Sequence, residues 1–294
     1  QCDILLLSPE RLANEDFRRR VLPSLNIGMF VVDEAHCISD WGHDFRPDYQ
    51  RIVNIINALP PNIPVLATTA TANDRVIEDI QQQLGDNLGI SRGTLIRDSL
   101  RLQVIKLADQ AERLAWLYEN LESLPGTGII YCLTTHDCDK VARWLKKKGY
   151  NVEPYHSKLG TNNLECAQLR AIREDQLMKN QVKALVATVA LGMGYDKPDV
   201  GFVIHYQRPG NLIAYYQQIG RAGRNISNAF AILLNGKEDD DIQEYFIKSA
   251  FPPEVDMIKV LQAIDNAEFG LSKNEILARV NANSAKIDKI LKFL

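Results

Sequence analysis

The sequence lacks several features that would indicate other classes of protein. No apolar run approaches the ~18 residues that a membrane-spanning helix needs, and the start, QCDILLLSPERL, has neither the charged flank nor the cleavage site of a signal peptide. The five cysteines include no C-x-x-C pair, which argues against a disulfide framework and a four-cysteine zinc site. We therefore expect reduced thiols, no zinc and no membrane contact. We expect the protein to be located in a bacterial cytoplasm or nucleoid rather than in a nucleus.

The chain also lacks a strong net charge. Its 34 Lys and Arg residues are balanced by 37 Asp and Glu residues, which leaves a formal charge of -3. Any contact with nucleic acid must therefore come from a local basic groove, because no overall cationic field is available. A composition of 46% hydrophobic and 24% charged residues is ordinary for a soluble globular protein, and 294 residues indicate about two domains.

Short apolar runs rich in Val and Ile alternate along the chain with stretches of helical period. Such runs are typical of strands buried on both faces of a parallel sheet. Their alternation with helices predicts the α/β fold class. The predicted strands are 3–9, 29–35, 65–70, 128–132, 184–189 and 202–206, and the predicted helices are 47–59, 73–85, 136–149 and 211–220.

Two changes in this pattern predict domain boundaries. Residues 91–107 interrupt the alternation with polar and turn residues, and a new series of strands and helices follows. We therefore assign residues 1–96 to the C-terminal part of a first lobe and residues 97–247 to a second lobe. Residues 248–294 end in two short amphipathic segments joined by Asn-Ala-Asn, which predicts a helical segment with an incomplete winged helix or helix-turn-helix.

The run VVDEAH places two adjacent carboxylates at the end of a predicted strand. A Mg²⁺-nucleotide site at the carboxyl edge of a parallel sheet requires such groups. Asp33 would hold Mg²⁺ through water, Glu34 would polarise the attacking water, and His36 would link this chemistry to the next domain. The alternative is a strand followed by a helix that merely starts with Asp-Glu.

The residues that follow place Trp41, His43, Phe45 and Arg46 in a loop punctuated by Gly and Pro. Aromatic and Arg side chains can stack on single-stranded bases, although Trp41 and Phe45 could instead fill a core. The whole string DEAHCISDWGHDFRPDY resembles helicase motif II of the RecQ family, together with the aromatic-rich loop that distinguishes this family. The resemblance implies two RecA-like parallel-sheet lobes, the first of them incomplete, that use ATP and Mg²⁺ and contact DNA through this loop.

Two further strings in the first predicted lobe occur in the order of that family. SPERL resembles a motif that faces the DNA track through Ser8, although a helix N-terminus explains Ser8 equally well. TTATA resembles motif III, in which Thr69 and Thr71 would couple the two lobes. The family more often has Leu at position 68 or 69.

The second predicted lobe carries resemblances to motifs IV, V and VI. TGIIYCLTT resembles motif IV, and VATVALGMGYDKPDV resembles motif V, in which Thr188 would face the DNA backbone and the turn at Gly194 and Asp196 would approach the nucleotide.

NLIAYYQQIGRAGR resembles motif VI. Gln217, Arg221 and Arg224 occupy positions i, i+4 and i+7, which predicts one face of a helix. The resemblance implies that Arg224 is the arginine finger that neutralises phosphoryl charge, with Arg221 beside it and Gln217 as a sensor. The alternative is a solvated basic helix face. Gly220 and Gly223 argue against it, because a helix that only presents a surface face would prefer good helix formers at these positions.

One expected motif is missing from the sequence. No string G-x-x-x-x-G-K-[ST], whose backbone N–H groups and lysine hold phosphates, occurs in these residues. We therefore expect the chain by itself to bind ATP weakly and to lack ATPase activity.

The resemblance implies an ATP-dependent DNA helicase motor, acting in DNA repair and recombination. It would move 3′ to 5′ on single-stranded DNA and unwind forked DNA as a monomer. Two alternatives remain. A catalytically silent DNA-binding or regulatory module would explain the missing phosphate loop. An RNA helicase of the wider DEAH group would share D-E-A-H, but would not be expected to carry the CISDWGHDFRP loop.

Overall fold

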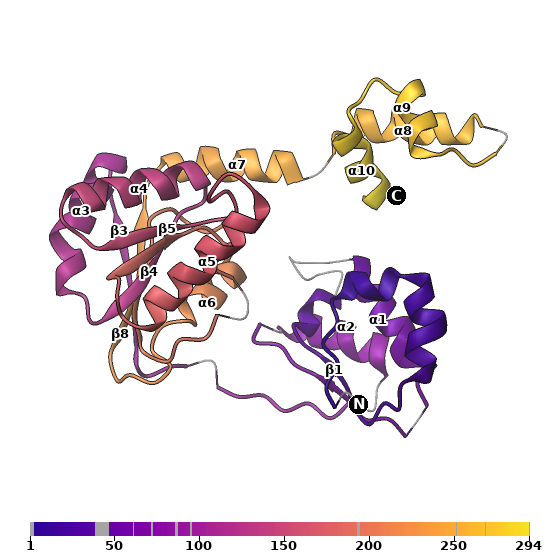
Figure 1. The fold of residues 1–294 in the computed structure, drawn as a ribbon, viewed down its shortest axis with the longest axis horizontal. Helices are drawn as coiled ribbons and strands as arrows, with labels where there is room; N and C mark the ends of the chain where they lie inside the picture. Colours follow the sequence, from indigo (N-terminus) through magenta and orange to yellow (C-terminus); the bar gives the residue numbers. More distant parts are fainter. Residues whose placement is uncertain are drawn as a thin grey trace.

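The computed structural model contains two parallel β-sheets, each with its own helices, and a helical C-terminal part (Figure 1). It describes residues 3–38, 47–60, 62–71, 73–85, 88–94, 96–192, 195–250, 252–267 and 269–293. In these ranges no helix is both long and apolar enough to cross a membrane.

The first sheet has two parallel strands in the described residues, with Phe30 opposite Val65. Its helices pack around a core that includes Val32, Ile38 and Ile80. Asn73 caps α2 by accepting a hydrogen bond from the N–H of Val76 at 2.9 Å. The elements are η1 (Pro9–Ala13), η2 (Phe17–Val21), η3 (Leu22–Ser24), β1 (Phe30–Val32), η4 (Ala35–Ile38), α1 (Pro47–Ala58), β2 (Val65–Ala67) and α2 (Asp74–Leu84).

The predicted strand at 3–9 is wrong. Residues 3–8 belong to no strand, and Pro9 begins the short helix η1. A strand requires the backbone of a neighbouring strand, and in the described residues β1 pairs with β2 and not with this segment. The side chain of Leu6 is 90% exposed as a result.

Within the described residues, the second sheet has six parallel strands in the order β3-β8-β7-β4-β6-β5. Strands β4, β6 and β7 are buried along their whole length, as their apolar sequences predicted. Residues of α3 and α4 pack in one core, and residues of α5 and α6 pack in a second core. The elements are β3 (Leu100–Lys106), α3 (Gln110–Asn120), η5 (Leu121–Ser123), β4 (Thr127–Tyr131), α4 (Thr135–Lys147), β5 (Val152–Tyr155), α5 (Asn163–Met178), β6 (Ala184–Ala187), β7 (Val200–His205), α6 (Leu212–Ile219) and β8 (Ala229–Asn235).

Strands β3 and β8 were not among the predicted strands. β3 lies at the edge of the sheet, and its exposed side chains include Leu102 and Val104. The polar residues Arg101 and Gln103 alternate with these apolar ones, which hides the strand from a search for continuous apolar runs. β8, AFAILLN, has the composition of a buried strand.

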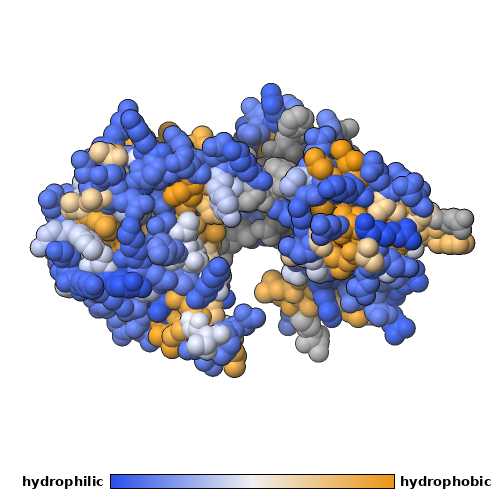
Figure 2. Space-filling view, turned by 90° about the horizontal axis from the view of Figure 1, so that it is seen from above, coloured by the Kyte–Doolittle hydropathy of each residue, from blue (hydrophilic) through white to orange (hydrophobic). Residues whose placement is uncertain are grey.

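The C-terminal helices form a small separate core around Val260, Ile276 and Ile287. The two predicted amphipathic segments are α9 and α10, and Ser272 and Glu275 form a capping box at the start of α9. The face of the molecule drawn in Figure 2 is mainly hydrophilic, with separate hydrophobic patches. The elements are α7 (Glu238–Ala250), α8 (Glu254–Asp265), α9 (Lys273–Arg279) and α10 (Ser284–Phe293).

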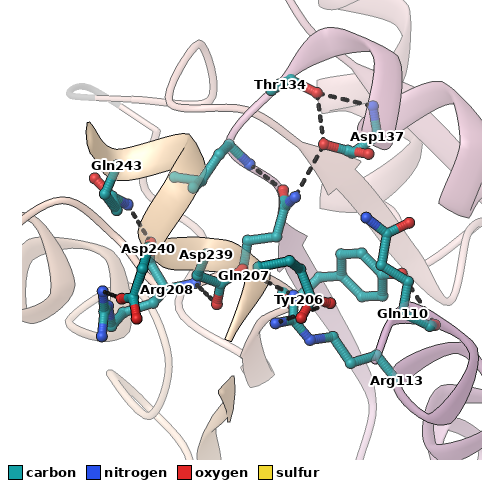
Figure 3. A network of polar contacts seen from close by, with 12 residues as sticks. Gln110, Arg113, Thr134, Asp137, Tyr206, Gln207, Arg208, Asp239, Asp240 and Gln243 are labelled. Carbon is teal, nitrogen blue, oxygen red and sulfur yellow. Dashed lines mark hydrogen bonds and ion pairs between the residues drawn. The ribbon is translucent and has the colours of Figure 1, made fainter. Parts of the chain in front are cut away.

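A buried polar network attaches the start of α7 to the second sheet (Figure 3). The guanidinium of Arg113, which is fully buried on α3, donates to the carbonyl of Tyr206 and to Asp239 on α7, both at 2.9 Å. The carboxylate of Asp239 also accepts from the N–H of Arg208 at 3.0 Å. Burial raises the pKa of Asp239, whereas its contacts with Arg208 and Arg113 lower it. Since a buried charge is costly unless it is paired, this pair fixes α7 against α3.

Candidate functional site

A cavity of about 660 Å³ lies between the residues that follow β1 and the residues around the end of α6. It brings together six of the predicted site residues, which come from opposite halves of the chain. The first part of the chain contributes carboxylates and the second part contributes guanidinium groups, with the segment before β3 forming another wall. The lining residues central to the chemistry are Asp33, Glu34, Asp196, Gln217, Arg221 and Arg224.

The carboxylates lie at a sharp turn at the end of β1. Oδ1 of Asp33 accepts hydrogen bonds from the Thr68 hydroxyl at 2.8 Å and from the N–H of Glu34 at 2.9 Å. Glu34 has φ 51°, in the left-handed region that a residue with a Cβ rarely adopts. The turn presents both carboxylates to the cavity.

His36 lies behind Glu34 and does not line the cavity. Its buried Nδ1 is 3.1 Å from Glu34 Oε2 and 3.1 Å from the hydroxyl of Thr69. Hydrogen bonding with Cys37 and then with Glu34 raises the pKa of His36 to about 9. This direction favours the protonated ring, which connects Glu34 to Thr69, a residue of the predicted coupling motif.

The arginines lie beyond α6, not on it. The helix ends at Ile219 with Gly220 as its C-cap, so the prediction that Gln217, Arg221 and Arg224 share one helix face is wrong. Gly220 keeps right-handed angles (φ -61°, ψ -7°), and the chain turns into the left-handed region at Gly223, with φ 71°. All three residues still line the same cavity.

The two arginines are held differently. Arg221 is 9% exposed, and its Nη1 donates to the carbonyl of Tyr195 at 3.1 Å. Its buried Nε has no hydrogen-bond partner among the described residues. Arg224 is exposed, and its Nη1 forms an ion pair with Asp196. Because an arginine keeps its proton in proteins, Arg221 brings a positive charge to the wall of the cavity.

Other predicted site residues lie outside the cavity. Ser8 is exposed immediately before η1. Thr71 donates its N–H to the Thr69 hydroxyl at 3.2 Å. Thr188 is buried after β6, where its N–H donates to Tyr155 O at 3.1 Å. Within the described ranges there is no group of three or more His, Cys, Asp or Glu side chains placed to hold a metal. The predicted residues Trp41, His43, Phe45, Arg46 and Gly194 lie outside the described residues.

Arg97 is a lining residue that the sequence analysis missed. It precedes β3, and its Nη1 donates to the carbonyls of Gly220 and Ala222 at 2.7 and 2.8 Å. Its only signal in the sequence is a basic residue in a polar stretch. That signal does not show that the residue lies beside a turn more than a hundred positions later.

An aromatic stack supports α6 from inside the lobe. The ring of His205 stacks on Tyr131 with centroids 5.6 Å apart, and its centroid is 5.0 Å from that of Tyr215. Nε2 of His205 is 2.7 Å from Gln218 Oε1, whereas its buried Nδ1 has no hydrogen-bond partner in the described residues. Burial lowers the pKa of His205 to about 4, against the opposing effect of Gln218.

His205 predicts a loss of stability in acid. Below pH 6.5 the unfolded chain binds a proton at this residue while the folded protein does not, until the pH reaches about 4. The free energy of unfolding should therefore fall across this window, by up to about 3 kcal/mol from this residue. Urea denaturation at several pH values should show a shallower pH dependence for His205→Gln than for the wild type. Equal slopes would contradict the assignment, and His136→Gln on the exposed side of α4 is the control.

Known proteins resemble this chain in both fold and sequence. A solved structure of Saccharomyces cerevisiae Dbp5 bound to RNA and ADP BeF3 matches with a TM-score of 0.62 at 23% identity, covering 82% of this chain and 61% of that one. This likeness confirms the predicted fold class of RecA-like parallel-sheet lobes. The helicase conserved C-terminal domain family matches residues 111–226, and the DEAD/DEAH box helicase family matches residues 1–80. The family matches place the chain among the DEAD/DEAH box helicase proteins.

Curated relatives narrow this class further. The probable ATP-dependent DNA helicase RecS of Bacillus subtilis is 35% identical over 90% of this chain and 52% of its own length. The RecQ-like DNA helicase blm-1 of Caenorhabditis elegans is 37% identical over 80% of this chain and 24% of its own length. The ATP-dependent DNA helicase RecQ of Pasteurella multocida is 34% identical over 79% of this chain and 35% of its own length. The chain belongs to the RecQ family, as its motifs predicted, and spans about half or less of the length of these relatives.

Proposed function

We propose that this chain is the motor part of an ATP-dependent DNA helicase that couples ATP hydrolysis to 3′–5′ movement along single-stranded DNA and to duplex unwinding. The observation that supports this function best is the cavity between the Asp33–Glu34 turn and the turn with Arg221 and Arg224. A metal-bound polyphosphate suits these two walls. Its metal ion is positive and pairs with carboxylates, and its phosphate oxygens are negative and pair with guanidinium groups. DNA, single-stranded or forked, is the proposed partner of a monomeric cytoplasmic motor.

The carboxylate wall fits Mg²⁺ and an attacking water. Asp33 offers oxygen ligands, which Mg²⁺ prefers, and we assign it to hold the ion through water. When bound, Mg²⁺ would neutralise phosphate charge. Glu34 is assigned to orient the attacking water and accept its proton. The charged His36 at 3.1 Å holds the Glu34 carboxylate in place and links it to Thr69.

The guanidinium wall fits the transferred phosphoryl group. Arg221 lines the cavity and is held by the carbonyl of Tyr195 at 3.1 Å, and we assign its guanidinium to a phosphate oxygen. The ion pair with Asp196 holds Arg224 beside the cavity, and we propose that Arg224 leaves this carboxylate for the phosphate as charge develops. Gln217 lies on the last turn of α6, and we propose that it acts as a sensor by contacting the phosphate from this helix.

The missing phosphate loop limits what the chain does alone. Backbone N–H groups and the lysine of such a loop supply much of the affinity for the β- and γ-phosphates. We propose that the 294-residue chain binds ATP weakly and does not hydrolyse it at a substantial rate. The full-length protein would supply the missing contacts.

The test compares ATP hydrolysis by this chain and by the full-length protein, each alone, with single-stranded DNA and with single-stranded RNA. We expect hydrolysis by the full-length protein alone, strong stimulation by DNA, little by RNA, and DNA binding that weakens as salt rises. Equal stimulation by RNA would favour an RNA helicase. Absence of hydrolysis in both proteins, with DNA binding retained, would favour a catalytically silent DNA-binding module and overturn the proposal.

A further inference from the structure

The turn that carries the two arginines, residues 220–224, cannot rely on a helix for its hydrogen bonds. α6 ends at Ile219, and Gly223 has φ +71°, so the chain leaves the helical path. The carbonyls of Gly220, Ala222 and Gly223 therefore lack the partners that a continuing helix would provide. Side-chain donors can replace these partners, and Nε of Arg224 donates to the carbonyl of Gly220 at 3.4 Å.

All three carbonyls receive a donor from the short segment that precedes β3. Nη1 of Arg97 donates to the carbonyl of Gly220 at 2.7 Å and to that of Ala222 at 2.8 Å. The Ser99 hydroxyl donates to the carbonyl of Gly223 at 2.6 Å. One guanidinium thus bridges the two carbonyls that flank the first arginine of the turn.

Strand pairing places this segment beside the turn. β3 runs parallel to β8 with Leu100 opposite Ala229, so the residues before each strand are neighbours. The fit is tight, because a Cβ at Gly223 would lie 2.7 Å from the Ser99 hydroxyl and 3.2 Å from Ala229 Cβ. Ala222 is fully buried. The turn has little freedom while these contacts hold.

We propose that Arg97 is a positioning residue that holds the turn in the conformation that directs Arg221 and Arg224 into the cavity. Its role in ATP hydrolysis rests on the function proposed above. Arg97 lies on the segment that connects the two sheets. If this segment moves, the two hydrogen bonds of Arg97 move the turn that carries both arginines. The connection between the lobes would thereby regulate the arginine geometry.

Amide hydrogen exchange tests the contact itself in the 294-residue chain. The N–H groups of Ala222, Gly223 and Asn225 are hydrogen-bonded at 3.0, 3.1 and 2.8 Å, so they have protection to lose. Arg97→Ala should raise exchange in the peptide 219–226 by about tenfold or more, because two bonds from a charged donor are lost. Arg92→Ala is the matched control, since Arg92 lies on the same segment and pairs with Asp74 at 2.7 Å.

ATP hydrolysis by the full-length protein tests the consequence. Arg97→Ala should lower kcat by about tenfold or more and change KM by less than about threefold, because the arginines act on the transition state. Arg97→Lys, which lacks the guanidinium group, should give an intermediate kcat. Added guanidinium ion should restore part of the kcat of Arg97→Ala, which a general loss of folding would not allow.

Each contrary outcome has a distinct meaning. Exchange in 219–226 equal to that of Arg92→Ala would overturn the contact, whatever the ATPase result. Raised exchange with unchanged kcat would overturn the positioning role. If the wild-type full-length protein hydrolyses no ATP, the proposed function fails together with the positioning role, while the exchange experiment still reports on the contact.

Discussion

Replacing Arg224 with alanine is expected to lower the kcat of DNA-stimulated ATP hydrolysis in the full-length protein by about a thousandfold or more, the size of effect that arginine fingers have in related phosphoryl transfers. The exposed guanidinium lies at the cavity in an ion pair with Asp196. Because its proposed contact forms as charge develops on the phosphoryl oxygens, the loss should appear in kcat and not in KM. Steady-state ATPase kinetics with saturating single-stranded DNA provide the measurement.

Arg224→Lys separates charge from geometry. Lysine retains the positive charge but lacks the planar, bidentate guanidinium, so its kcat should remain well below that of the wild type. Arg143→Ala, at an exposed position on α4, removes an arginine of the same lobe and should leave kcat unchanged. A kcat for Arg224→Ala within about threefold of this control would refute the assigned role, since an arginine finger contributes far more.

Replacing Glu34 with glutamine is expected to lower ATP hydrolysis by about 10²–10⁴-fold, the range for loss of a general base. Glutamine preserves the size of the side chain and removes its charge. The turn should persist, because Asp33 and Thr68 retain their hydrogen bond of 2.8 Å. Binding of single-stranded DNA should be unchanged, since the cavity and not the DNA track is altered.

The control for this variant is Glu78→Gln, at an exposed position on α2. It removes the same charge from the same lobe without altering the cavity. Retained hydrolysis in Glu34→Gln would exclude Glu34 as the base. A parallel loss of DNA binding would instead indicate damage to the first lobe, which measurement of the unfolding transition would reveal.

The fold class and the central strands of the second sheet could be predicted from the sequence because they depend on short-range patterns. Strands buried on both faces are continuous apolar runs, and β4, β6 and β7 are buried throughout. Edge strand β3 has an alternating pattern and was missed. The run at 3–9 is as apolar as a strand, but β-structure requires a neighbour that a single segment cannot specify.

The site was only partly predictable for a related reason. Asp33, Glu34, Arg221 and Arg224 belong to recognisable strings, so the sequence by itself determined the family and the chemical groups. The tertiary structure decided that these groups meet in one cavity, that α6 stops at Ile219, and that Arg97 binds the turn beyond it. The contact of Arg97 depends on the pairing of β3 with β8, which joins segments more than a hundred residues apart. Local sequence determines hydrogen bonds within an element, whereas contacts between distant segments exist only once the sheet order is set.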